Sequence, residues 1–362
     1  MNPKIQKMIA SLSFLLLLFA LWQMGNQKKV MAIKAVYWWK TSFSKNSYGN
    51  EKENEFMQKH EIKKMYVKLL DVDYSEGAGI FPVVKTQIDY YPGEAGDSTD
   101  YIPVIYITNQ VLQHIDSANI DYYAKNFIRH ALRLETYIHR NINEIQIDCD
   151  WTKGTRETYF QLLECMRYWA PQYQYSVTLR LYPYKYRSEL GIPPVNRVML
   201  MVYNIENARN YKQSNSIFNV HEAAKYLVKK NYPLPMDYAL PVFSWTLVYR
   251  NQQFLRVFTN NIIPEINANI YAGQTDSTQL KRLEPNLFLV VKPNRGYDPY
   301  SLKAGDILKL ESCGEKELSE ASLLFSRLPF TTQTTIALFD LDPNDLEKIS
   351  YEKIEAAYAP FH

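Results

Sequence analysis

The amino-acid sequence predicts a single (β/α)8 barrel of the TIM type with an insertion between its seventh and eighth strands. Short apolar runs alternate with longer amphipathic stretches, the order typical of βα units around a parallel sheet. Eight such runs can be counted, and eight parallel strands close this barrel. No glycine-rich phosphate turn follows the first run, which disfavours the rival open, doubly wound sheet. The predicted strands are 33–41, 65–74, 102–108, 144–152, 175–182, 198–204, 238–246 and 334–342.

The segments between these strands predict helices and two longer excursions. Helical spacing of apolar residues occurs at 50–60, 121–140, 156–169 and 220–229. The stretch 77–100, rich in Gly, Pro, Asp and Tyr, is expected to be a long loop on the face where barrel sites are built. A larger insertion at about 251–330 contains its own expected strands and helix. The barrel with this insertion is expected to span residues 31–362.

The N-terminus has the layout of an export signal. Two lysines, Lys4 and Lys7, precede the apolar run 8–24, which is about 17 residues long, the lower limit for a membrane span. Residues 1–30 are therefore expected to be either a cleaved signal peptide or an uncleaved membrane anchor, followed by a linker. The expected location is outside the cytoplasm, periplasmic or at the cell surface, and the membrane is a partner if the run is retained.

Composition narrows the possible partners. The 41 Lys and Arg nearly balance the 38 Asp and Glu, and no basic block stands out, so a nucleic-acid partner is not expected. Aromatic residues are abundant, with 29 Tyr, 16 Phe and 6 Trp, and such rings can stack on the apolar faces of sugars.

Other kinds of chemistry lack the residues they need. The three cysteines have no metal-ligand spacing, and no histidine lies at a strand end, so neither a metal nor a cofactor is expected. No Gly-x-Ser-x-Gly elbow or P-loop occurs, which disfavours a serine hydrolase and a nucleotide-dependent enzyme.

Acidic side chains mark the end of the fourth predicted strand. Alternation along 144–152 turns the apolar residues toward the helices and places Gln146, Asp148, Asp150 and Thr152 inside the barrel. Two aspartates on one face of a strand are costly to bury unless they are paired, hydrogen-bonded or used. Either they form a site, or they form a salt-bridge network that fixes strand register.

Two further predicted strands end in the same Asp-x-Asp spacing. Asp71 and Asp73 end the second strand, where Asp73 could instead cap the following loop. Asp340 and Asp342 end the last strand, and Asp342 has the sequence context of a turn and helix N-cap.

The remaining strand ends supply partners for these carboxylates. Arg180 points inward on the fifth strand and is expected to pair with Asp148 or Asp150. Tyr203 and Asn204 end the sixth strand, and Trp245 lies near the end of the seventh, although Tyr203 and Trp245 could also be core aromatics. Carboxylates, an arginine, an amide and aromatic walls are typical of a polyol-binding pocket with acid or base groups.

Two segments resemble chitinase-like glycoside hydrolases of family eighteen. The run Ile147-Asp-Cys-Asp-Trp-Thr152 is similar to that family's fourth-strand signature, in which two spaced aspartates lead to Trp-Glu and the glutamate is the general acid. Met201-Val-Tyr203-Asn204 is similar to its sixth-strand Met-x-Tyr-Asp. The sequence departs from the family at Thr152, which replaces the acid, and at Asn204, which replaces the aspartate.

Most of the chain after residue 31 resembles an uncharacterised family of bacterial exported proteins with predicted barrel folds. That likeness implies the fold and export, and no assigned reaction. The resembling residues are Gln146-Ile-Asp-Cys-Asp150 with Thr155, Tyr159 and Leu162, then Ser176-Val-Thr-Leu-Arg180, and Pro193-Pro194 through Met201-Val-Tyr-Asn204.

Two hypotheses follow for function. In the first, the protein is a glycoside hydrolase acting on a cell-envelope or dietary polysaccharide. Asp150 is then the acid or base, Asp148 orients it, and Arg180 holds the charge. In the same hypothesis Tyr203 and Asn204 position the sugar, and Asp71 or Asp73 could replace the missing glutamate. In the second, the barrel binds glycans or an envelope partner without catalysis, having lost the acid at Thr152.

Overall fold

The computed structural model describes residues 32–43, 51–88, 98–210, 213, 215–227, 231–267, 278–293 and 300–359. The apolar run 8–24, for which the sequence predicts an export signal or an anchor, lies outside these residues. Within the described ranges, no helix is long and apolar enough to cross a membrane.

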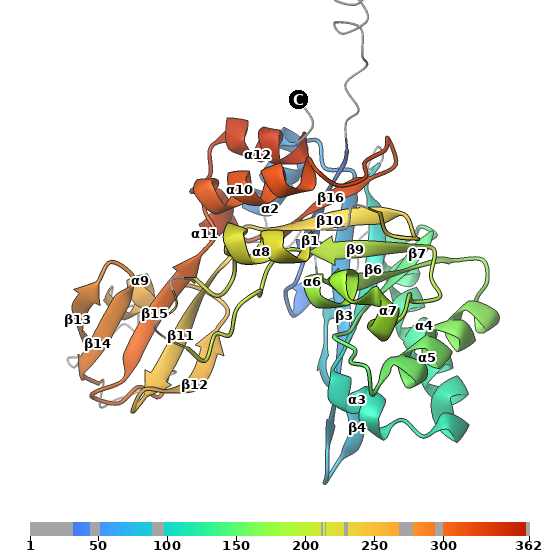
Figure 1. The fold of residues 1–362 in the computed structure, drawn as a ribbon, viewed down its shortest axis with the longest axis horizontal. Coiled ribbons are helices and arrows are strands. Elements are labelled where there is room, and N and C mark those ends of the chain that lie inside the picture. The colour runs from blue at the N-terminus through green and yellow to red at the C-terminus, as the bar shows by residue number, and fades with distance from the viewer. Residues whose placement is uncertain are drawn as a thin grey trace, which may run out of the picture.

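Eight parallel strands form a closed barrel, as the sequence predicts (Figure 1). Each strand pairs with the next one along the chain, and closure comes from β1, which pairs with both β16 and β3. The barrel strands are β1 (Ile33–Trp38), β3 (Lys64–Ser75), β6 (Asp100–Ile107), β7 (Glu144–Asp148), β8 (Gln174–Arg180), β9 (Arg197–Met201), β10 (Met236–Pro241) and β16 (Thr335–Phe339).

Helices follow the strands and cover the outside of the barrel (Figure 1). The longest, α4 (Ile120–Ile138), buries an apolar stripe that includes Ala124, Ala131 and Leu134. It packs against α5 (Arg156–Trp169), whose range matches the predicted helix. The remaining helices around the barrel are α2 (Glu51–Lys59), α3 (Asn109–His114), the 3-10 turn η1 (Ser117–Asn119), α6 (Leu181–Lys185), α7 (Arg187–Leu190), α8 (Val220–Tyr226), α10 (Glu315–Phe325), α11 (Pro343–Leu346) and α12 (Tyr351–Tyr358).

The prediction of a long loop over 77–100 is wrong for its first part, and residues 89–97 of that stretch lie outside the described residues. Its first part is the strand β4 (Gly79–Lys85), which pairs antiparallel with the end of β3 and extends it into a hairpin. Pro82 is tolerated because β4 lies at the edge of the sheet, where a missing N–H leaves no ladder bond unmade. A short strand, β5 (Gln87–Ile88), then pairs with β2 (Ser42–Phe43).

An antiparallel sheet is inserted between β10 and β16, and it stands to one side of the barrel in Figure 1. The seventh barrel strand ends at Pro241, so the predicted strand 238–246 was too long. Because Val242 and Phe243 continue the apolar run, the sequence pattern did not indicate the break after Pro241. The sheet has the order β12-β11-β15-β14-β13, with α9 (Ile263–Asn267) beside it. Its strands are β11 (Ser244–Arg250), β12 (Gln253–Phe258), β13 (Gln279–Glu284), β14 (Leu287–Lys292) and β15 (Ile307–Ser312).

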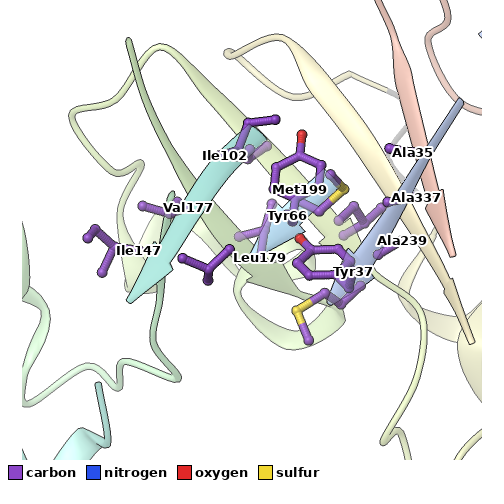
Figure 2. Packing of buried hydrophobic residues seen from close by; sticks show 14 of the residues in the cluster. Ala35, Tyr37, Tyr66, Ile102, Ile147, Val177, Leu179, Met199, Ala239 and Ala337 are labelled. Carbon is purple, nitrogen blue, oxygen red and sulfur yellow. The ribbon is translucent and has the colours of Figure 1, made fainter. Parts of the chain in front are cut away.

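Side chains fill the barrel interior. The rings of Tyr37 and Tyr66 stack at 4.8 Å and lie beside Met199 (Figure 2). The Tyr37 hydroxyl donates to Gln146 Oε1 at 2.7 Å, and the Gln146 amide donates to Ser176 at 3.3 Å. Because Gln146 therefore points inward, Asp148 and Asp150 on the same strand face share its direction. The interior is a packed core beneath a polar mouth, as in other barrels of this class.

Candidate functional site

An ion pair stands at the mouth of the barrel between β7 and β8. Arg180 is the last residue of β8, and Asp150 lies two residues beyond the end of the neighbouring β7. The Arg180 guanidinium donates from Nε to Asp150 Oδ1 and from Nη2 to Oδ2, each at 2.7 Å. This two-point geometry is the strong form of an arginine–carboxylate pair. The expected pairing of Arg180 with an aspartate of the fourth barrel strand is confirmed.

A pocket of about 520 Å³ opens beside this ion pair. Its walls are mostly apolar, and Tyr182 on α6 is half exposed into solvent there. A few polar groups among apolar walls are typical of small-ligand pockets. The lining residues are Cys149, Asp150, Trp151, Thr152, Lys153, Arg180, Leu181, Tyr182, Pro183, Glu189, Leu190, Tyr203, Asn204, Ile205 and Tyr226.

The turn that carries Thr152 is fixed by its neighbours. Thr155 accepts a hydrogen bond from the Thr152 backbone N–H at 2.9 Å and donates to Asn109 at 2.6 Å. The Trp151 indole donates to the Leu190 carbonyl at 3.0 Å and stacks on Tyr159. Thr152 therefore lines the pocket wall with a hydroxyl group, which has no acidic proton to give at neutral pH.

Asp148 lies below the pocket, inside the barrel. Its side chain is buried, and the Thr178 hydroxyl donates to its Oδ1 at 2.5 Å. Burial, reinforced by the charge of Asp150, raises the pKa of Asp148 to about 6. Asp148 does not line the pocket, and the roles expected for Asp148 and Asp150 stay predictions.

The two aspartates of β3 have separate partners. Lys68 donates from Nζ to Asp71 Oδ2 at 2.9 Å and lies 5.1 Å from the centre of the Trp39 ring. The other Asp71 oxygen is buried and has no hydrogen-bond partner among the described residues. Asp73 accepts the Thr108 hydroxyl at 2.6 Å, which ties the end of β3 to the end of β6. Asp71 thus keeps one oxygen unused, whereas Asp73 has a structural contact.

Tyr203 and Asn204 reach the pocket wall just beyond β9. Tyr203 is nearly fully buried and stacks on Phe339 at 5.1 Å. Asn204 has a left-handed backbone with φ of 53°, a conformation that asparagine tolerates better than most residues. Its carbonyl oxygen accepts from Arg180 at 3.5 Å, and its buried side-chain Oδ1 has no partner within the described chain. That oxygen is buried beneath the pocket wall and is not presented to the pocket.

A row of aromatic rings crosses the mouth, and sequence reasoning did not single out most of its members. Trp39 lies edge-on to Tyr106 at 6.5 Å and to Phe339 at 5.3 Å, and Phe339 lies 5.5 Å from Phe243. Trp39, Tyr106 and Phe339 are partly exposed. The pair Trp38-Trp39 at the end of the first strand was the sequence signal for this row.

Trp245 joins the row from an unexpected element. It belongs to β11 of the inserted sheet and not to the end of the seventh barrel strand, and it contacts Phe243 at 5.7 Å. Its indole donates to Glu311 Oε2 at 2.9 Å, and the Ser216 backbone N–H and hydroxyl donate to the same oxygen. Lys309 lies 2.6 Å from the other oxygen, and both members of this pair are buried. This network fixes Trp245 and the segment after β9 against the sheet.

The end of β16 supplies one further carboxylate. Burial, with the charges of Asp342 and Asp345, raises the pKa of Asp340 to about 7. The Asp340 carboxylate is close enough to Tyr203 for its charge to contribute to the raised pKa of that phenol. Asp342 accepts from the Asn344 N–H at 2.9 Å as the N-cap of α11, so the expected cap is confirmed.

The fold is similar to that of solved chitinase-like proteins. A chitinase from Bacteroides thetaiotaomicron superposes with a TM-score of 0.50 at 8% identity, over 91% of this chain and 97% of that one. The spore cortex-lytic enzyme SleL of Bacillus cereus gives 0.49 at 12% identity, over 92% and 75%. The chitinase-like agglutinin of Robinia pseudoacacia gives 0.44 at 10% identity, over 91% and 99%.

The first of these likenesses confirms the expected distant similarity to chitinase-like hydrolases at the level of the fold. A scan against models of known protein families finds no match. A search of curated protein sequences finds no match either.

The mouth thus combines groups suited to a polyhydroxylated ligand. The Arg180–Asp150 pair offers directional polar contacts, and Tyr182 and the partly exposed rings of Trp39, Tyr106 and Phe339 offer flat apolar ones. Among the described residues, no cluster of three or more His, Cys, Asp or Glu side chains could hold a metal ion.

Proposed function

We propose that this chain is a glycoside-hydrolase-like protein whose barrel mouth binds a carbohydrate, at the pocket beside Arg180. One observation carries the proposal: the rigid Arg180–Asp150 pair lies on the wall of a mostly apolar pocket with an exposed tyrosine. Sugars present hydroxyls at their rim and C–H groups on their faces. A fixed polar pair beside an aromatic ring matches both surfaces.

The groups that could donate a proton in this pocket favour binding without hydrolysis. A conventional glycosidase needs a carboxylic acid that can protonate the leaving oxygen. Thr152 has replaced that group, and both oxygens of Asp150 accept hydrogen bonds from Arg180. A carboxylate held in this way is suited to orienting hydroxyls and poorly suited to delivering a proton.

Hydrolysis is the second candidate, and Asp340 favours it. This carboxylate stands at the end of β16 with a pKa raised to about 7 by burial and by neighbouring negative charges, so about half of it is protonated near neutral pH. A raised pKa is what a general acid requires. In this version Asp340 is the acid, and the polysaccharide of the cell envelope or diet is the substrate.

Export belongs to the same proposal. The lysines and apolar run at the N-terminus favour a protein placed outside the cytoplasm, where such polysaccharides occur. Protease accessibility of the chain in intact cells tests this part: digestion from outside supports it, and full protection until the cytoplasmic membrane is opened contradicts it.

The proposed binding is tested by measuring how purified full-length chain is retarded in native gels that contain chitin derivatives, xylan, β-glucan or dextran. The Tyr182→Ala variant removes the exposed ring of the pocket, and Leu323→Ala, an exposed apolar residue on α10, is the matched control. Retardation that Tyr182→Ala weakens and Leu323→Ala does not would support the pocket as the binding site. Retardation in none of the gels would contradict it.

A further inference from the structure

A second group of exposed aromatic rings lies on the helical layer, away from the strand ends that form the mouth. Tyr122 on α4 is 64% exposed, and Tyr168 and Trp169 at the end of α5 are 74% and 43% exposed. Tyrosine and tryptophan normally bury most of their rings, and single exposed apolar residues need no explanation. Three exposed aromatic residues on two contacting helices, however, require an explanation.

A hollow of about 400 Å³ lies between these helices and reaches Tyr168. Ile120 and Ala118 are apolar residues of its lining, and Asp121, Glu164 and Gln161 add two carboxylates and an amide. Among the residues that the structure describes, no lysine or arginine lines it, and the nearby Lys125 lies over the Trp169 ring. The remaining lining residues are Ser117, Cys165 and Tyr168.

The Trp169 ring is held in place at this surface. Its indole N–H donates to Asp121 Oδ1 at 3.1 Å, and the Lys125 ammonium lies 3.6 Å from its ring centre. Tyr168 stands edge-on to Trp169 at 5.1 Å. Trp169 is held by α4 and contacts one edge of Tyr168, and this contact limits the orientations open to the exposed tyrosine ring, which lowers the entropic cost of binding.

We propose that this hollow is a second carbohydrate-binding surface, separate from the barrel mouth, with Tyr168 as its stacking platform. The polar lining restricts the ligand: the carboxylates of Glu164 and Asp121, the latter already bonded to Trp169, and the Gln161 amide oxygen can accept hydrogen bonds from sugar hydroxyls, and the two carboxylates repel phosphates. Nucleic acids and anionic membranes are therefore poor occupants, since both are bound through lysine and arginine. A neutral polysaccharide chain suits both the apolar and the hydrogen-bond-accepting residues of this lining.

A second site on the same chain would act through multivalency. A long polysaccharide that occupies the mouth raises the local concentration of sugar at the hollow, so the two sites together retain the polymer better than either alone. A short oligosaccharide gains nothing from this arrangement. The role of the hollow in joint retention rests on the proposed function of the mouth, whereas its own affinity does not.

Native gels containing one polysaccharide each, chitin derivative, xylan, β-glucan or dextran, test the proposal with the full-length chain. The variants are Tyr168→Ala, Tyr182→Ala at the mouth, and the double variant, with Leu323→Ala and Tyr168→Phe as controls. Loss of one stacking ring is expected to weaken retention roughly fivefold, and Tyr168→Phe, which keeps the ring, is expected to retain it.

The outcomes separate the two sites. Weaker retention by Tyr168→Ala, with normal retention by both controls, supports the second surface, even if Tyr182→Ala changes nothing and the mouth proposal fails. Retention by Tyr168→Ala equal to that of Leu323→Ala overturns the second surface and leaves the mouth proposal standing. A change in oligomeric state caused by Tyr168→Ala, measured by light scattering, would identify the surface as a self-association interface and overturn the proposal. The proposal is also overturned if none of the gels retards the unaltered chain.

Discussion

Arg180 holds Asp150 through two hydrogen bonds of 2.7 Å at the rim of the pocket. The pair places a carboxylate and a guanidinium side by side on the wall of the pocket. In the proposed binding role, these two side chains orient sugar hydroxyls beside Thr152, which carries no acidic proton.

Breaking this pair is expected to weaken carbohydrate binding more than it weakens the fold. Asp150→Asn removes a charged acceptor, so binding should fall roughly tenfold, the equivalent of about 1.5 kcal/mol for a hydrogen bond to a charged group. The free energy of unfolding should fall by only about 1 kcal/mol, because the Asp150 side chain is 46% exposed.

Titration calorimetry with the retained oligosaccharide and urea unfolding measure the two effects. Glu157→Gln, which breaks the exposed pair between Arg156 and Glu157, is the control and should change neither quantity. Unchanged affinity in Asp150→Asn would remove the pair from the site.

Asp148→Asn should flatten the dependence of stability on acidity. The folded pKa of Asp148 is raised to about 6, above its unfolded value, so the folded state binds more protons than the unfolded state between about pH 4 and 6. The contribution of Asp148 to the free energy of unfolding is therefore lost as pH rises through that window, and it does not return at higher pH. The asparagine variant keeps an acceptor for Thr178. Its free energy of unfolding, relative to that of the unaltered chain, should rise by on the order of 2 kcal/mol from pH 4 to pH 7.5. Urea unfolding at the two pH values tests this, and a parallel shift at both would contradict it.

Lys68 and Asp71 should behave as a coupled pair. Lys68→Met leaves the Asp71 carboxylate with little exposure and without its cation, and should cost about 3 kcal/mol of unfolding free energy. Adding Asp71→Asn should recover a large part of that loss. A double-mutant cycle by urea unfolding measures the coupling, and additive effects of the two substitutions would show that the pair contributes nothing.

Glu311 should anchor the inserted sheet to the segment after β9. Glu311→Gln leaves Lys309 buried without a counter-charge, so we expect a loss of about 3 kcal/mol and altered fluorescence of Trp245, whose indole loses a charged acceptor. Glu222→Gln in the exposed pair with Lys225 is the control, with an expected change below about 0.5 kcal/mol. If both variants unfold alike, the buried network has no stabilising role.

Asp340 gives the hydrolysis candidate a pH signature. If any polysaccharide is cleaved, kcat/KM should fall as pH rises through about 7, because the acid loses its proton there, and Asp340→Asn should lower kcat by at least about a hundredfold. Reducing-sugar release across pH 5 to 9 measures both. Cleavage that survives in Asp340→Asn and disappears in Asp150→Asn would return the acid role to Asp150.

Much of the fold follows from local pattern. All eight barrel strands and the helix over 156–169 are readable because alternation and helical spacing report which face is buried. The Arg180–Asp150 contact follows from strand order, since neighbouring parallel strands end at the same rim. Each of these depends on residues close in sequence or on adjacent strands.

What escaped prediction depends on tertiary closure. Trp39 and Phe339 are 300 positions apart and meet only because the first and last strands pair. The edge strand β4 has the Gly and Pro content of a loop, and the break after Pro241 lies inside a continuous apolar stretch. Lys68 occupies an inward position among apolar neighbours, so its pairing with Asp71 could not be read from composition.

Calorimetric titration of the full-length chain with oligosaccharides of the retarding polysaccharide, alongside a reducing-sugar assay on the same samples, tests the central claim most directly. The account predicts saturable binding that Tyr182→Ala and Asp150→Asn both weaken, with no sugar released. Binding that neither variant changes, or no binding to any oligosaccharide, would contradict it.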